Sequence, residues 1–237
     1  MAYVALIAAA GNGSRMALQT PKQYACLAGM PMLYHAVRSL AAEPIETVFV
    51  VLAQEDGMFA QQDWREFEGR LEPLYCGGAT RRDSVFNGLV AAMDAVEADD
   101  WVLVHDAARP CLPRGDLDRL IAEVSGDPIG GLLALPVTET VKRIAGSGNS
   151  DAAGSVRVAA TEDRSKLWLA QTPQMFRAGL LAEALRRAQP TVTDEASAVE
   201  QMGLKPRLVA GSRQNLKVTY PDDLAIAEAI LARRELR

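Results

Sequence analysis

Three features are scarce in this sequence of 237 residues: cysteine, an excess of positive charge, and long apolar runs. The three cysteines, Cys26, Cys76 and Cys111, are odd in number and include no C-x-x-C pair. We therefore expect reduced thiols in a cytoplasmic protein and no disulfide framework. Lys and Arg number 25 against 30 Asp and Glu, which gives a net charge of −5. This balance argues against nucleic-acid binding, because a nucleic-acid-binding surface is basic.

No apolar run approaches the roughly 20 residues of a membrane span, so we expect no membrane association. No basic region precedes the apolar stretch at residues 3–7, and we expect this stretch to be the first core strand and not a signal peptide. Hydrophobic residues make up 49% of the chain, which argues against disorder. The length suits one domain with a sizeable core, and we expect it to comprise residues 1–237.

Strands and helices are expected to alternate along the chain. Apolar runs predict buried strands at residues 3–9, 47–53, 71–76, 101–105 and 131–137. Apolar residues at helical spacing predict helices at residues 32–40, 82–96 and 117–124. Further along, we expect strands at residues 166–170, 206–209 and 215–218, and helices at residues 177–187, at residues 193–202 with Thr193 as N-cap, and from Pro221 onward. This alternation predicts an α/β fold that is Rossmann-like, with a mainly parallel sheet and helices on both faces.

Residues 138–161 interrupt this alternation. Two stretches in which polar and apolar residues alternate flank a polar, glycine-rich segment at residues 146–151, and this pattern predicts a β-hairpin. A hairpin alone in water is only marginally stable, so we expect this protruding arm to pack on another surface. A plain surface loop is the alternative that the sequence leaves open.

A glycine-rich loop, A-A-A-G-N-G-S-R-M, follows the first predicted strand. Gly11 and Gly13 allow backbone N–H groups to approach an anion closely, and Arg15 and Lys22 add two positive charges. A protein with a negative net charge that binds a polyphosphate has to concentrate its cations locally. The two cations of this glycine-rich loop therefore favour binding of a nucleoside triphosphate. Met16 stands where the dinucleotide motif G-x-G-x-x-G needs its third glycine, and the Walker A pattern G-x-x-x-x-G-K-[ST] does not occur.

Two more loops follow the carboxyl ends of predicted strands. One contains Gly77 and Gly78, and the other begins at Asp106. Ligands of open parallel sheets bind at this edge, so the three loops should converge on one site. His105 precedes Asp106 within a strand whose side chains alternate between two faces, and we expect this histidine to be structural.

Seven motifs occur in order from about Val4 to Ile230: A-A-G-x-G-x-R-M, P-K-Q-Y, G-G-x-x-R-x-D-S-V, V-H-D-A-A-R-P-C, T-P-Q, T-D-E-A-S-A and N-x-K-V-T-x-P-x-D-L. Together they resemble the 2-C-methyl-D-erythritol 4-phosphate cytidylyltransferases. The resemblance implies a single nucleotidyltransferase domain that transfers CMP from CTP to this polyol phosphate, with release of pyrophosphate, for the non-mevalonate route to isoprenoid precursors. It also implies a homodimer in which the arm of residues 138–161 reaches the second subunit.

The catalytic roles implied by the resemblance belong to four cations: Arg15 and Lys22 at the triphosphate, Lys217 at the substrate phosphate, and Arg164 at the methylerythritol phosphate. Arg157 is an alternative to Arg164. An attacking phosphate is already ionised near neutral pH and needs no general base, so the site has to hold two anions together and stabilise charge at the α-phosphate. Mg²⁺ or another divalent cation that bridges phosphates is the usual partner in such chemistry.

The resemblance also implies further contacts, which divide between nucleotide and substrate. The nucleotide contacts are expected at Ala9, Ala10, Gly11, Gly13, Gly77, Gly78, Ala79, Arg81 and Ser84. The substrate contacts are expected at Asp106, Arg109, Thr140 and Thr172. The close backbone of the Gly-Gly loop can exclude a purine, which is larger than a pyrimidine. Asp106 is also the candidate for a Mg²⁺-linked role.

Three other functions compete with this one. A cytidylyltransferase for another polyol phosphate, such as ribitol 5-phosphate, would differ mainly in the shape of its pocket. A non-catalytic nucleotide-sensing module on the same fold would be expected to lose the cationic loop residues, which are present here. A dinucleotide-dependent oxidoreductase would need a third glycine and an acidic ribose-binding residue about 20 residues further on, for which Glu43 is poorly placed.

Overall fold

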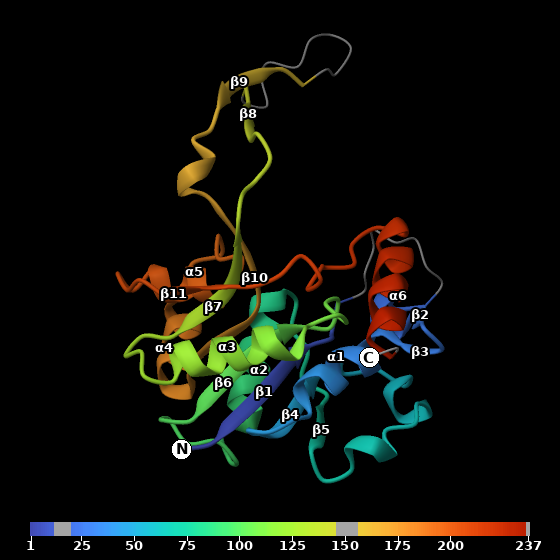
Figure 1. Ribbon diagram of the computed structural model, residues 1–237. Helices are drawn as coiled ribbons and strands as arrows, with labels where there is room; N and C mark the ends of the chain where they lie inside the picture. Colours follow the sequence, from blue (N-terminus) through green and yellow to red (C-terminus); the bar gives the residue numbers. More distant parts are fainter. Residues whose placement is uncertain (12–19, 146–155, 236–237) are drawn as a thin grey trace.

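The computed structural model describes residues 1–11, 20–145 and 156–235. Helices surround a central sheet (Figure 1). The 7-stranded sheet has the order β11-β7-β10-β6-β1-β4-β5. Its strands are β1 (Tyr3–Ala8), β4 (Ile45–Val51), β5 (Leu71–Leu74), β6 (Trp101–Asp106), β7 (Gly131–Pro136), β10 (Trp168–Arg177) and β11 (Arg207–Ala210). In this sheet β10 runs antiparallel to its neighbours β6 and β7, and the other pairs are parallel. The prediction of a mainly parallel α/β sheet is confirmed.

The apolar sequences of the central strands are explained by burial on both faces. All residues of β6 are buried, and so are the inner residues of β1. β1 lies between β4 and β6 and pairs with both of them in parallel. Strands of this kind are covered by helices on either side, so continuous apolar runs form them in place of alternating ones.

Helices cover both faces of the sheet, as expected. One face packs against α1 (Met32–Leu40) and α3 (Arg114–Val124) in a single hydrophobic cluster. The opposite face packs against α2 (Arg81–Ala92), α4 (Ala178–Arg187) and α5 (Glu195–Glu200) in a second cluster. No helix in the described part of the chain is both long enough and apolar enough to cross a membrane.

The C-terminal helix α6 (Asp222–Glu235) packs beside the main sheet, next to the short strands β2 (Cys26–Leu27) and β3 (Met30–Pro31) (Figure 1). A third small core there includes Val218 and Ala227. This packing holds the segment that precedes α6 against the loop that follows β6. Short 3-10 turns complete the described elements: η2 (Lys22–Tyr24), η3 (Phe59–Gln61), η4 (Arg65–Phe67) and η5 (Arg164–Lys166).

The arm contains β8 (Lys142–Ile144) and β9 (Val158–Thr161), which pair antiparallel in a two-stranded sheet of their own. Figure 1 shows this pair away from the main sheet, at the end of the segments that leave β7 and return to β10. Ile144 is 59% exposed and Val158 is 63% exposed, so the pair carries apolar side chains that the described residues leave uncovered. The glycine-rich segment predicted at residues 146–151 lies outside the described residues.

One strand prediction is wrong, and the bounds of another need correction. The segment at residues 215–218 forms no strand, because its backbone contacts loops: the Val218 N–H donates to the Ala108 carbonyl oxygen at 2.8 Å. At residues 166–170, η5 is followed by β10, which starts at Trp168 and continues through Pro173. Proline is tolerated there because the pairing of β10 with β7 is irregular at this point, so no ladder hydrogen bond is lost.

The predicted helix ends also need correction. Asp194, and not Thr193, is the N-cap of α5, because its carboxylate accepts a hydrogen bond from the Ser197 N–H in a capping box. The helix predicted at residues 82–96 is α2, which starts one residue earlier and ends at Ala92. Its N-cap is Thr80, whose hydroxyl accepts a hydrogen bond from the backbone of its first turn.

Candidate active site

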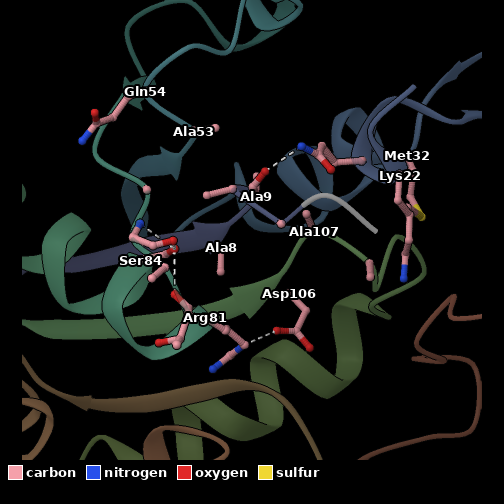
Figure 2. A pocket seen from close by; sticks show the side chains of 18 of the residues that line it. Ala8, Ala9, Lys22, Met32, Ala53, Gln54, Arg81, Ser84, Asp106 and Ala107 are labelled. Atoms are coloured by element: carbon pink, nitrogen blue, oxygen red, sulfur yellow. Dashed lines mark hydrogen bonds and ion pairs between the residues drawn. The ribbon is translucent and has the colours of Figure 1, made fainter. Parts of the chain in front are cut away.

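A cavity of about 630 Å³ opens at the carboxyl ends of β1, β4 and β6. The lining residues that were predicted from the sequence are Ala9, Ala10, Gly11, Lys22, Gly77, Gly78, Ala79, Arg81, Ser84, Asp106 and Lys217. Figure 2 shows Lys22 and Met32 on one side of this space, with Gln54 and Ser84 on the other. The three loops that follow β1, β5 and β6 therefore meet at one sheet edge, as the parallel topology predicts.

Six predicted site residues are not among these lining residues: two fall outside the described part of the chain, two lie at the base of the arm, and Arg109 and Thr172 lie behind the cavity wall, as described below. Gly13 and Arg15 are outside the described residues. Thr140 and Arg164 are exposed residues at the base of the arm, and in the described part of the chain they do not line the cavity. The Arg164 guanidinium donates a hydrogen bond to the carbonyl oxygen of Thr138.

Gly77 and Gly78 let the backbone approach the cavity wall closely. A Cβ atom on Gly77 would lie 2.8 Å from the carbonyl oxygen of Leu52, and one on Gly78 would lie 2.6 Å from the Cβ of Asp83. Both separations are shorter than real carbon contacts, so neither position accommodates a larger residue without movement. The Gly78 N–H donates to the Ser84 hydroxyl at 3.0 Å, which ties this loop to the first turn of α2.

Two side chains that follow Lys22 fix its short turn, and neither was predicted as a site residue. The Gln23 amide donates to the Ala9 carbonyl oxygen at 2.7 Å, which joins the turn to the end of β1. The Tyr24 hydroxyl lies 2.8 and 2.9 Å from the two carboxylate oxygens of Asp56, in the loop after β4. Burial and this hydrogen bond raise the pKa of Tyr24, so its hydroxyl remains a donor. Lys22 is thereby held between two loops of the sheet edge.

Asp106 is the carboxylate on which several cations converge. Its Oδ1 accepts a hydrogen bond from Arg81 Nε at 2.8 Å, an ion pair that Figure 2 shows, and its Oδ2 lies 2.8 Å from Lys217 Nζ. Arg109 Nε lies 3.8 Å from the same Oδ2. Burial alone would raise the pKa of Asp106, but the charges of Arg81 and Lys217 hold it well below its ordinary value. The carboxylate is therefore ionised, with a cation at each oxygen.

Glu195 belongs to this network, although the sequence analysis gave it no role at the site. Its side chain is fully buried, and its two oxygens accept hydrogen bonds from Arg81 Nη1 at 2.6 Å and Nη2 at 3.0 Å. In the sequence it is one acidic residue in the first turn of a helix, a common position for an acid. The available signal is its place in T-D-E-A-S-A, where the alanines that follow indicate burial of this turn.

Buried polar groups behind Asp106 fix its backbone. The Asp106 N–H donates to the Thr172 hydroxyl at 3.1 Å, and this hydroxyl lies 3.0 Å from Nδ1 of His105. His105 Nε2 lies 3.0 Å from the carbonyl oxygen of Arg109, and the Arg109 guanidinium donates to the carbonyl oxygen of Asn215 at 2.7 Å. The structure thus places Thr172 and Arg109 behind the cavity wall, and His105 has the structural position expected for it.

The acidic residues among those that line the cavity are Asp106 and Glu55. In the described ranges, no group of three His, Cys, Asp or Glu side chains is arranged to hold a metal ion. Both oxygens of Asp106 already contact cations. These residues do not fit a divalent cation held by protein side chains alone, and they fit one that arrives on the phosphates of a ligand.

A model of the family IspD, 2-C-methyl-D-erythritol 4-phosphate cytidylyltransferase, matches residues 3–233. The chain belongs to this family. The 2-C-methyl-D-erythritol 4-phosphate cytidylyltransferase of Dechloromonas aromatica (strain RCB) is 53% identical over 98% of this chain and 99% of its own length. That of Laribacter hongkongensis (strain HLHK9) is 57% identical over 96% of this chain and 95% of its own.

Solved structures of IspD proteins share this fold. A 4-diphosphocytidyl-2C-methyl-D-erythritol synthase superposes with a TM-score of 0.82 at 38% identity, over 97% of this chain and 98% of the other. The IspD of Francisella tularensis gives a TM-score of 0.79 at 32% identity, over 97% of this chain and 100% of the other. Members of the IspD family are cytidylyltransferases, a class of nucleotidyltransferase.

The buried imidazole of His105 predicts a pH dependence of stability. Burial lowers the pKa of His105 from 6.5 to about 4. Between these values the unfolded chain binds a proton that the folded protein does not, so the free energy of unfolding falls as the pH falls, by up to about 1.4 kcal/mol per pH unit. Asp106, whose pKa is also lowered, contributes in the same direction only as the pH approaches 3.8 and below. Denaturant unfolding at a series of pH values measures the slope.

The variant H105Q separates this contribution from the others, because glutamine keeps two polar atoms but does not titrate. We expect a flatter dependence of the unfolding free energy on pH in H105Q between pH 6.5 and 4, whatever its absolute stability. An unchanged slope would contradict the assignment to His105.

Proposed function

We propose that this protein transfers CMP from CTP to 2-C-methyl-D-erythritol 4-phosphate, which forms 4-diphosphocytidyl-2-C-methyl-D-erythritol and pyrophosphate in the non-mevalonate route to isoprenoid precursors. The observation that carries the proposal is one cavity, in a chain of the IspD family, where two glycine loops meet Lys22 and the Lys217–Asp106 ion pair. We infer that residues 1–237 act as a single nucleotidyltransferase domain, with residues 138–161 as an inserted arm.

The reaction needs little covalent chemistry from the protein. A phosphate oxygen of the polyol phosphate forms a bond to the α-phosphorus of CTP, and the bond from this phosphorus to the β-phosphate oxygen breaks, so pyrophosphate leaves with the electron pair. The attacking phosphate is already ionised near neutral pH and requires no general base. The protein contributes by holding two anions together and by stabilising the charge that grows on the α-phosphate.

The cations divide between the two reactants in this proposal. Lys22, together with Arg15, stabilises the triphosphate and the transition state, and Lys217 holds and orients the attacking phosphate. The Lys217–Asp106 distance of 2.8 Å supports this role, because the carboxylate fixes the ammonium group at the cavity wall. The nucleotide is held by backbone and side-chain groups of Ala9, Ala10, Gly11, Gly13, Gly77, Gly78, Ala79 and Ser84.

Mg²⁺ or another divalent cation enters, in this proposal, as its complex with the CTP phosphates. The arrangement of the acidic residues that line the cavity supports this route, because Asp106 is paired at both oxygens. When bound, such a cation withdraws charge from the phosphates and eases departure of pyrophosphate.

The arm is proposed to join two copies of the chain in a homodimer. Two observations support this: Thr140 and Arg164, at the base of the arm, do not line the cavity of their own subunit, and Ile144 and Val158 are exposed on the arm, which stands away from the main sheet (Figure 1). In a dimer, residues of one arm would reach the substrate in the partner's cavity. A cytoplasmic location is proposed as well, since the three cysteines are unpaired.

The function is tested by pyrophosphate release with CTP and Mg²⁺, with 2-C-methyl-D-erythritol 4-phosphate and ribitol 5-phosphate in parallel. We expect turnover with the first substrate and little with the second. Turnover mainly with ribitol 5-phosphate would keep the chemistry and reject the isoprenoid assignment. Absence of turnover with both, in folded protein that binds CTP, would favour a nucleotide-sensing module.

The variant K22A tests the role of Lys22. We expect kcat to fall by about 100-fold or more, because the transition state loses a cation, while the melting temperature stays near that of the wild type. The matched control is K205A, since Lys205 is exposed and does not line the cavity. Near-normal turnover in K22A would exclude the proposed role.

The variants R164A and R157A, assayed separately, decide which arginine of the arm region holds the substrate phosphate. We expect R164A to raise KM for the polyol phosphate by about 10-fold or more, since a charge-assisted contact is worth about 1.5–3 kcal/mol, and to leave KM for CTP unchanged. R157A should have little effect. The opposite ranking would assign the role to Arg157, and no effect of either would remove the arm from the substrate site.

A further inference from the structure

The Arg81 guanidinium donates hydrogen bonds to two carboxylates from different elements, those of Glu195 and Asp106. Its Nη1 and Nη2 face the two oxygens of Glu195 at 2.6 and 3.0 Å, while its Nε faces Asp106 Oδ1 at 2.8 Å. All three guanidinium nitrogens therefore donate to protein oxygens. A cation committed in this way to two carboxylates has its charge neutralised locally, which makes it a poor ligand for a phosphate.

The position of Glu195 is itself fixed by the main sheet. The backbone N–H of Ala196 donates to Gln174 Oε1 of β10 at 2.7 Å, and Gln174 Nε2 donates to the Asp194 carboxylate at 2.9 Å. Asp194 caps the same helix through Ser197. The first turn of α5 is thus attached on both sides of Glu195, so this carboxylate offers Arg81 a rigid, fully buried partner.

The pairing with Glu195 determines how Arg81 meets Asp106. A guanidinium prefers to bind a carboxylate through two parallel hydrogen bonds. Here Glu195 takes that two-point contact, and Asp106 receives a single hydrogen bond at Oδ1. The other oxygen, Oδ2, is thereby left to Lys217 at 2.8 Å. Without the Glu195 charge, Arg81 could turn both ends of its fork toward Asp106 and compete with Lys217 for Oδ2.

We propose that Glu195 is a positioning residue: through Arg81 it divides the two oxygens of Asp106 between Arg81 and Lys217, and so holds Lys217 in place for the attacking phosphate. Arg81 accordingly links Glu195 to Asp106 within the protein and does not act as a cation of the triphosphate site. This inference rests on the proposed function, because it takes Lys217 to be the group that orients the polyol phosphate.

The variant E195Q in the full chain tests the proposal, because glutamine keeps the shape and removes the charge. We expect kcat/KM for the polyol phosphate to fall by about 10- to 100-fold, since Lys217 is misplaced. The Kd of CTP with Mg²⁺, measured by calorimetry, should stay near the wild-type value. E195D, which keeps the charge on a shorter side chain, should recover part of the loss. E200Q is the control, because Glu200 is exposed on the same helix.

A double-mutant cycle with K217M distinguishes positioning from a general structural role. If Glu195 acts through Lys217, E195Q should have little further effect on kcat/KM in the K217M background. Additive losses would overturn the proposal. So would a rise in the Kd of CTP as large as the loss of turnover, because Arg81 would then be acting on the triphosphate.

If E195Q does not fold, the pair R81M/E195M tests the mechanism from the other side, because it removes both the Glu195 charge and the guanidinium that would compete for Asp106 Oδ2. Lys217 should then stay on Oδ2, so the CTP affinity and kcat/KM for the polyol phosphate should stay close to the wild-type values, and a loss of kcat/KM of about 10- to 100-fold would overturn the proposal. A crystal structure of E195Q decides the inference independently of activity: Arg81 on both oxygens of Asp106 with Lys217 displaced supports it, and an unchanged Lys217–Asp106 pair overturns it. Wild-type turnover tests the proposed function separately.

Discussion

The cavity depends on keeping the carboxylate of Asp106 ionised, although this residue is buried to 7% exposure at the cavity wall. A buried charge of this kind needs opposite charges beside it, and breaking one such pair typically costs about 3–5 kcal/mol. The cations come from three separate segments: Arg81 at the start of α2, Arg109 after β6, and Lys217 before α6. One negative charge therefore links the positions of elements that have little else in common, including a C-terminal segment without regular secondary structure.

Burial of the hydrophobic core offsets the free-energy cost of burying this charged cluster. The strands that end at the cavity, above all β1 and β6, are buried along almost their whole length, and helices pack on both faces of them. Burial of that much apolar surface stabilises the fold and fixes the strand ends, so the loops that follow need few contacts of their own. Behind the cavity wall, the hydroxyl of Thr172 contacts both the backbone N–H of Asp106 and the imidazole of His105. These hydrogen bonds fix the end of a strand that the core already holds in place.

The sequence predicts the parts of this structure that depend on local pattern. A buried strand requires a continuous apolar run, as at residues 3–9, and parallel topology then places the loops that follow such strands at one edge. The segment at residues 215–218 looks like an edge strand, but its hydrogen-bond partners are loop residues such as Ala108, which no local pattern reveals. No local pattern marks Glu195, because its hydrogen-bond partner Arg81 is 114 positions away in the sequence.

Strand β10 belongs to two parts of the molecule at once. Its first residues, from Trp168, are exposed at the base of the arm, and its later residues, from Gln171, are buried between β6 and β7. Thr172, at the start of the buried part, accepts the hydrogen bond from the backbone of Asp106. One continuous strand therefore joins the base of the arm to the hydroxyl that fixes the Asp106 backbone, so the arm and the cavity edge share a covalent connection only a few residues long.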